Sequence, residues 1–173
     1  MKFSDMDIAM FAYWSAIRNQ RRTRRRGMLN SRNGRHHQKG NYMAAWQFDL
    51  YIEGPEAPPP NVSEAGWEPP LLPLPLVYDI QQELAHYMGP PWLMLEDWFV
   101  FGPENGNRIL LFEDDVGAAV SIRCDVREEA PQFLVLVADL TRFHGCRFFS
   151  PLTREFIEPD LELVLDVIRK SQA

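Results

Sequence analysis

The net charge of this chain changes sign near Met43, and this change limits where a folded domain can lie. Residues 1–42 contain ten lysines and arginines and two acidic residues, a net charge of +8. Residues 43–173 contain eight basic and 22 acidic residues, a net charge of −14. From Arg18 to Gly40 there is no acidic residue and almost no apolar one, so burial cannot offset the entropy cost of ordering this stretch. We therefore expect a disordered basic arm over residues 1–42, with an amphipathic start, and one folded acidic domain over residues 43–173.

Length and composition predict one globular domain of an intracellular protein. A chain of 173 residues, 46% hydrophobic, is long enough for one ordinary domain. Two cysteines, Cys124 and Cys146, are too few for a disulfide framework. The apolar residues 8–17 precede the arginines, the reverse of a secretory signal, and no apolar run approaches the roughly 20 residues that span a bilayer. We expect a cytoplasmic protein without a membrane span. The sequence does not determine its oligomeric state.

Hydrophobic periodicity predicts an α+β fold. A long loop is expected from Gly54 to Pro75, which holds eight of the 14 prolines, and Asn105-Gly106 predicts a tight hairpin. The expected elements are strands at 46–53, 98–101, 108–112, 120–127 and 147–149, and helices at 77–88, 131–145 and from 159 onward. This order, β-α-β-β-β-α-β-α, favours a mainly antiparallel sheet with helices packed on one face, and a ferredoxin-like fold is one form of it.

The sequence contains no catalytic signature, so we predict no catalytic residue, no metal site and no cofactor. Cys124, Cys146, His86 and His144 lack the close spacing of zinc ligands. There is no nucleophile elbow and no glycine-rich phosphate loop. An enzyme of unrecognised type, with Cys146 as the nucleophile and His144 as its base, stays open as an alternative.

Charged residues in the second half are the candidate contacts for a partner. Arg123, Asp125 and Arg127 alternate with apolar residues and are expected to point away from the core. They can pair with carboxylates on neighbouring strands or form part of a recognition surface, and both alternatives stay open. The acidic runs 113–115 and 128–129, at two predicted turns, are further candidates. The residues that we expect to contact a partner are Glu113, Asp114, Asp115, Arg123, Asp125, Arg127, Glu128 and Glu129.

The arginine-rich arm allows a second interpretation. Phosphate contacts from an arginine cluster bind RNA or DNA with strong salt dependence. The candidate residues for this alternative are Arg21, Arg22, Arg24, Arg25 and Arg26. Equally, translation could begin at Met43, because the composition changes there and the first good strand follows directly.

Several short segments of the second half resemble a loosely defined group of small, mostly uncharacterised bacterial proteins, some of them suspected immunity partners of polymorphic toxins. The resemblance covers about residues 44–171. The matching segments are Trp98 with Gly102, Asn107–Ile109, Cys124–Arg127, Gly145–Pro151 and Pro159–Ser171. The resemblance implies a non-enzymatic inhibitor that sequesters a toxin. The charge of the domain agrees with a cationic partner, because complementary charge speeds encounter.

Overall fold

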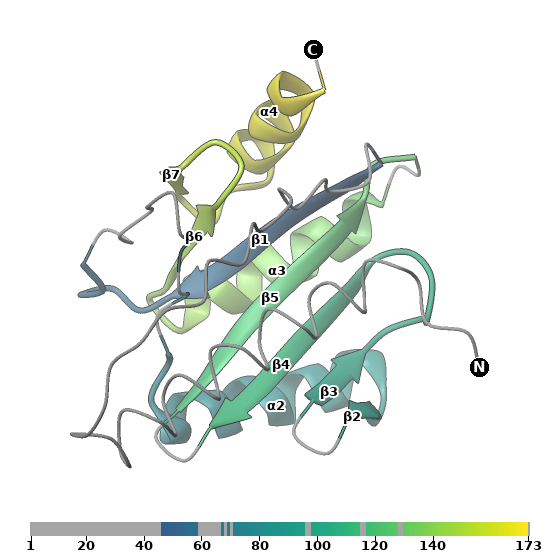
Figure 1. Ribbon diagram of the computed structural model, residues 1–173, viewed down its shortest axis with the longest axis vertical. Helices are drawn as coiled ribbons and strands as arrows, with labels where there is room; N and C mark the ends of the chain where they lie inside the picture. Colours follow the sequence, from purple (N-terminus) through teal and green to yellow (C-terminus); the bar gives the residue numbers. More distant parts are fainter. Residues whose placement is uncertain are drawn as a thin grey trace, which may run out of the picture. The chain divides into compact units, whose positions relative to one another are not determined.

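The computed structural model describes residues 46–58, 67, 69, 71–95, 98–114, 117–127 and 130–172 (Figure 1). The chain divides into two units, residues 1–44 and 45–173, and the described residues belong to the second. The elements are β1 (Gln47–Glu53), α2 (Leu74–Met88), β2 (Trp92–Leu95), β3 (Trp98–Phe101), β4 (Arg108–Asp114), β5 (Gly117–Asp125), α3 (Pro131–Phe143), β6 (Arg147–Ser150), β7 (Glu155–Ile157) and α4 (Leu161–Ser171). The amphipathic start and the disordered arm predicted for residues 1–42 lie outside this part.

The described strands form one seven-stranded sheet in the order β2-β3-β4-β5-β1-β6-β7. Every neighbouring pair in it is antiparallel, so the predicted α+β class with a mainly antiparallel sheet is confirmed. The predicted element order is incomplete because it lacks β2 and β7. A ferredoxin-like arrangement is not confirmed: its split βαβ units contain parallel strands, whereas β1 here lies between two antiparallel neighbours, β5 and β6.

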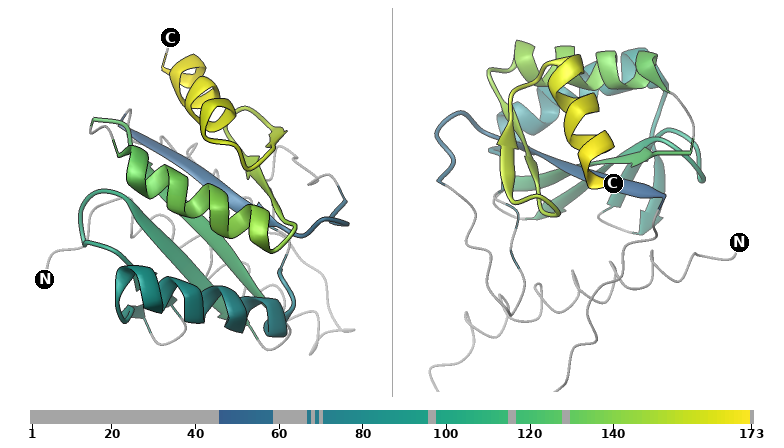
Figure 2. Two further views of the ribbon diagram at one scale, coloured as in Figure 1. Left: turned by 180° about the vertical axis from the view of Figure 1, so that it is seen from behind. Right: turned by 90° about the horizontal axis from the view of Figure 1, so that it is seen from above.

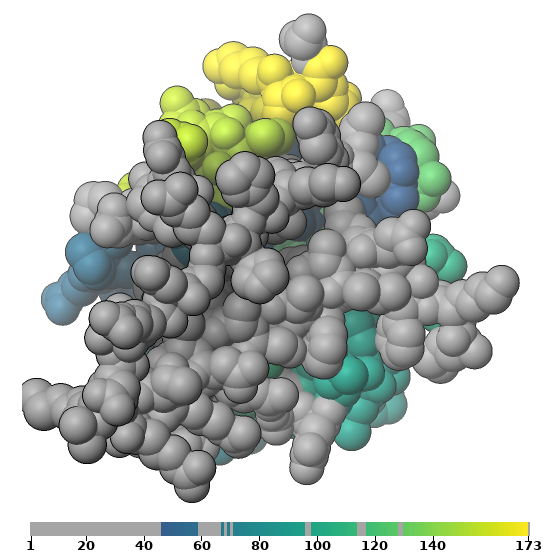
Figure 3. Space-filling model, viewed as in Figure 1, coloured from purple at the N-terminus to yellow at the C-terminus, as the bar shows by residue number. Residues whose placement is uncertain are grey.

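All three described helices lie on one face of the sheet, as predicted (Figure 2). The alternation of β1 turns Phe48, Leu50 and Ile52 toward them, and Val77 of α2 and Val137 of α3 pack into the same buried core. Full burial of each large apolar side chain contributes about 1.5–3 kcal/mol. α4 lies beside the β6–β7 hairpin (Figure 3) and adds Val164 and Ile168 to the core.

The helix ends follow from local sequence. α2 begins at Leu74, three residues before the expected start, because Pro75 fits the first turn of a helix. It ends before Gly89, whose φ of 84° a residue with a Cβ rarely adopts. The side chain of Asp160 accepts hydrogen bonds from the backbone N–H groups of Glu162 and Leu163 and so caps α4. The predicted helices at 77–88, at 131–145 and after 159 are thus confirmed, each with its end shifted by a few residues.

The predicted hairpin is confirmed as the β3–β4 connection, but it is not the tight turn that was expected: residues 102–107 form the loop between the two strands. Gly102 and Gly106 both have positive φ there, at 109° and 107°. The end of the proline-rich loop does more than connect elements, since Leu72 forms an isolated β-bridge with Ala118 at the start of β5. Among the described residues, no helix is long and apolar enough to cross a membrane.

Candidate functional site

The face of the sheet opposite the helices carries an ion pair at its centre. Asp49 of β1 and Arg123 of β5 are direct partners across the strands, and Arg123 Nε donates to Asp49 Oδ1 over 3.1 Å. Arg123 is only 1% exposed. The orientation predicted for Arg123, away from the helices, is correct, and its cross-strand pairing is the first of the two predicted alternatives. Because breaking a buried ion pair is destabilising, this pair favours the register in which Asp49 and Arg123 lie opposite each other.

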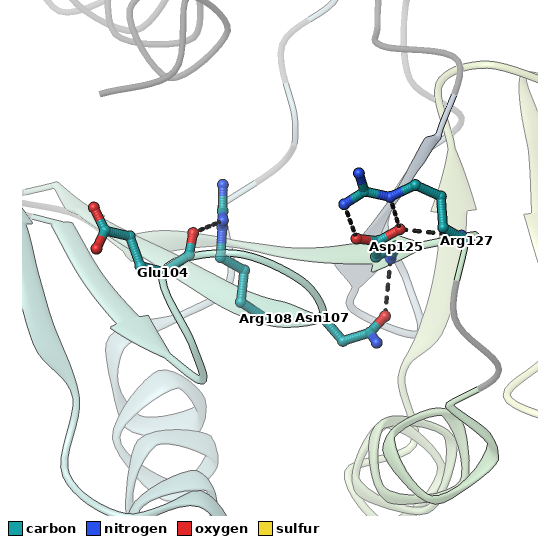
Figure 4. Close-up of polar contacts among 5 residues, drawn as sticks. All are labelled: Glu104, Asn107, Arg108, Asp125 and Arg127. Carbon is teal, nitrogen blue, oxygen red and sulfur yellow. Dashed lines mark hydrogen bonds and ion pairs between the residues drawn. The ribbon is translucent and has the colours of Figure 1, made fainter. Parts of the chain in front are cut away.

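A second ion pair lies at the end of β5, where Figure 4 shows Asp125 and Arg127 facing each other. Arg127 donates from Nε to Asp125 Oδ1 over 2.9 Å and from Nη2 to Oδ2 over 2.6 Å. The guanidinium also stacks on Trp46, with its central carbon 4.1 Å from the ring centroid. The side chain of Arg127 is 57% exposed, whereas that of Asp125 is buried. This arrangement holds an exposed arginine rigidly at the end of the sheet.

The electrostatics of this pair keep Asp125 ionised. The side-chain hydrogen bonds from Arg127 lower the pKa of Asp125 below its ordinary value, and they outweigh the opposing effect of burial. The backbone N–H of Asp125 donates to Asn107 Oδ1 over 2.9 Å, which ties the β3–β4 loop to the end of β5. In the same loop, Arg108 Nη1 donates to the carbonyl oxygen of Glu104 (Figure 4). The side chains of Asn107 and Arg108 therefore fix the loop at its β4 end.

Glu113 and Asp114, two of the acidic residues predicted as partner contacts, lie far from this pair. Glu113 and Asp114 end β4, and β4 runs antiparallel to β5, so they lie at the opposite end of the hairpin from Asp125. Along β5, Asp125 lies seven residues from Ala118, the partner of Glu113, which at about 3.3 Å per residue is roughly 23 Å. Glu113 instead approaches α2, where its Oε1 accepts from Gln81 Nε2 over 3.4 Å. Asp115, Glu128 and Glu129 lie outside the described residues.

A buried carboxylate at Glu53 was not found from the sequence. Glu53 ends β1, is completely buried, and neither carboxylate oxygen accepts a hydrogen bond from a described residue. Burial raises its pKa to about 7, against the opposing charge of Arg147. Alternation in the sequence places Glu53 on the polar face, but its burial depends on the fold around it.

Arg147, the cross-strand partner of Glu53, is held by other groups. Its guanidinium lies 3.6 Å above the ring of Phe156, and its Nη2 donates to the carbonyl oxygen of Ala57 over 2.9 Å. Trp67 packs against both Tyr51 and Phe149 close by. These contacts form an aromatic cluster at this side of the sheet, which no sequence motif indicated.

The two cysteines have the environment of core thiols. Burial raises the pKa of both Cys124 and Cys146, whereas a nucleophilic thiol requires a lowered pKa. The thiol of Cys146 donates to the backbone carbonyl of His144 over 3.6 Å, and the imidazole Nε2 of His144 lies 3.4 Å from Glu83 Oε1. His144 Nε2 is buried and has no hydrogen-bond partner among the described residues, so this contact with Glu83 is an ion pair only when the imidazole is protonated. Among the described residues, no three His, Cys, Asp or Glu side chains come together as metal ligands would.

The arginines of the nucleic-acid alternative lie outside the described residues; they are Arg21, Arg22, Arg24, Arg25 and Arg26. Comparisons with protein-family models, with curated proteins and with solved structures find no match. The resemblance to suspected immunity proteins and the role of each candidate contact therefore stay predictions.

Proposed function

We propose that residues 43–173 form a non-enzymatic protein-binding module whose partner is a basic protein, most plainly an immunity-type inhibitor that sequesters a cationic toxin. The observation that carries this proposal is the excess of 14 negative charges in this part of the chain. Four of its eight basic residues already form ion pairs with its own carboxylates, namely Arg123, Arg127, Arg142 and Lys170. The negative excess persists however the other basic residues pair.

Electrostatic attraction supplies the mechanism. A body of one sign draws a partner of the opposite sign, which raises the association rate and opposes docking of like-charged proteins. A nuclease that binds phosphate through basic residues is blocked when an acidic surface covers those residues. Inhibition of this kind requires no chemical step, in agreement with the buried thiols of Cys124 and Cys146. Both cysteines are free, which supports placement in the reducing cytoplasm.

Titration calorimetry tests this proposal with the purified protein and each basic protein encoded beside its gene. We expect one of them to bind with an affinity that falls as salt rises, and to lose its own activity in the complex. If no neighbour-encoded basic protein binds, the proposal loses its main support.

The alternative function, a nucleic-acid-associated regulator, depends on the arginine cluster of residues 21–26. It predicts that RNA or DNA binds the full chain in a salt-sensitive manner and that removing residues 1–42 abolishes this binding. Unchanged binding after the truncation would rule out residues 1–42 as the nucleic-acid binding site.

A further inference from the structure

The outer side of α2 carries two exposed tyrosines. We call it the outer α2 face and define it as Tyr78, Asp79, Gln82, Glu83 and Tyr87. Tyr78 is 50% exposed and Tyr87 is 63% exposed, although both are large aromatic side chains. Figure 2 shows the outer side of α2 from behind the sheet, and no other described element crosses it. Exposed tyrosines flanking a row of polar residues are typical of a protein-binding surface.

The acids of α2 have no lysine or arginine on their own helix, whose basic residue is His86. Asp79 and Glu83 are one turn apart, where two like charges repel each other. α2 contains no lysine or arginine. On the other two described helices, by contrast, an aspartate pairs with a base one turn away: Asp139 with Arg142 over 2.9 Å and Asp166 with Lys170 over 2.6 Å.

The rest of the described chain compensates these acids only in part. Glu83 lies 3.4 Å from the imidazole of His144, which carries charge only when protonated. Asp79 is exposed and has no hydrogen bond or ion pair with any part of the chain that the structure describes. The exposed ring of Phe143, which precedes His144, adds an aromatic side chain beside this contact. A repelling pair of acids, one exposed and one partly exposed, thus lies among aromatic rings.

We propose that the outer α2 face is the docking surface for a lysine- or arginine-rich segment of a protein partner, an inference that rests on the proposed function. A cationic side chain placed between Asp79 and Glu83 relieves their mutual repulsion and pairs with both. The faces of Tyr78 and Tyr87, on either side of these acids, attract further cations of the same segment through cation–π contacts. Tyrosine also provides contact area at a low entropy cost, since it has only two side-chain torsions to fix.

The test measures binding of the full-length protein to a fluorescently labelled peptide of alternating lysine, arginine and glycine. The variant is Asp79→Lys, and the matched control is Glu158→Lys, which makes the same charge change at an exposed position shortly before α4. The introduced lysine keeps α2 folded because it can pair with Glu83 one turn away. We expect Asp79→Lys to weaken peptide binding roughly tenfold, because an attraction becomes a repulsion and Glu83 is neutralised.

If the peptide binds only through general attraction to an acidic protein, the two variants should bind it equally weakly. Equal losses for Asp79→Lys and Glu158→Lys would therefore overturn the assignment of this surface, while peptide binding by the parent protein would leave the proposed function standing. If the parent protein itself does not bind the peptide, this inference is contradicted, while the proposed function is decided separately by the titration with neighbour-encoded basic proteins.

A second pair of variants tests the aromatic part of the surface. Tyr87→Ala should weaken peptide binding about threefold through loss of a cation–π contact. Leu163→Ala, which truncates an exposed apolar residue on α4, should have no effect. Amide chemical shifts of the parent protein should change along residues 78–87 when the peptide is added. Shift changes confined to other elements would overturn the proposal.

Discussion

At the residue scale, the most consequential side chain of the sheet is Glu53, a buried carboxylate without a hydrogen-bond donor among the described residues. Its pKa is about 7 in the folded protein, against an ordinary value of 4.5. The folded state therefore holds this proton more tightly than the unfolded state. The contribution of Glu53 to the free energy of unfolding is therefore largest below about pH 4.5, falls as the pH rises, and is lost above about pH 7.

Substitution of Glu53 by Gln should remove this pH dependence. The shift corresponds to a free energy of up to about 3 kcal/mol, and Glu53→Gln should stabilise the protein at pH 8 much more than at pH 5. Urea unfolding at the two pH values measures the difference. Glu56→Gln, in the exposed turn after β1, serves as the control and should change little. Equal effects of Glu53→Gln at both pH values would contradict the burial of an ionisable carboxylate there.

A backbone position in the β6–β7 turn gives a second prediction at this scale. Arg154 has a φ of 61°, a left-handed conformation that is unfavourable for a residue with a Cβ. Arg154→Gly should therefore raise the free energy of unfolding by up to about 1 kcal/mol. Thr153→Gly, one residue earlier, should lower it, because glycine there adds only chain entropy to the unfolded state. Thermal unfolding of both variants provides the measurement, and a destabilised Arg154→Gly would contradict the strained turn.

At the element scale, the elements that the sequence predicted are those with strong periodicity. The alternation of β5 correctly predicted that Arg123 points away from the helices, and its cross-strand pairing with Asp49 was one of two stated alternatives. β2 and β7 were missed because strands of four and three residues show no clear alternation, and their pairing with β3 and β6 supplies the stability. The burial of Glu53 and the clustering of Trp67 with Tyr51 depend on contacts between distant segments, which one sequence does not reveal.

The bridge between the proline-rich loop and β5 predicts a large effect of a small substitution. A Cβ added at Gly117 would lie 2.4 Å from the backbone oxygen of Leu72, which cannot move without breaking the Leu72–Ala118 bridge. Gly117→Ala should therefore destabilise the protein by on the order of 2 kcal/mol. Gly54→Ala is a suitable control, because its added Cβ would meet only a side-chain atom of Leu72 at 3.9 Å. Equal stability of the two variants in urea would contradict the close approach of Gly117 to the backbone of Leu72.

At the scale of the whole molecule, the division of charge is the feature from which our functional account starts. The sequence alone predicted it, because counting charges requires no structure. The candidate contacts, however, do not form a single surface: Arg123 is buried, and Glu113 lies at the opposite end of its hairpin from Asp125. The outer α2 face could not be chosen from the sequence, since the burial of neighbouring residues decides which helical residues stay exposed.

Affinity capture from the native host tests whether the acidic domain binds a basic protein. The baits are the full-length chain and a version that begins at Met43, each at low and at moderate salt, with the retained material identified by mass spectrometry. We predict that both baits retain the same single basic protein, because the binding surface belongs to residues 43–173. Retention by the full-length chain alone, of nucleic acid that is lost as salt rises, would contradict the account and assign the function to the basic arm.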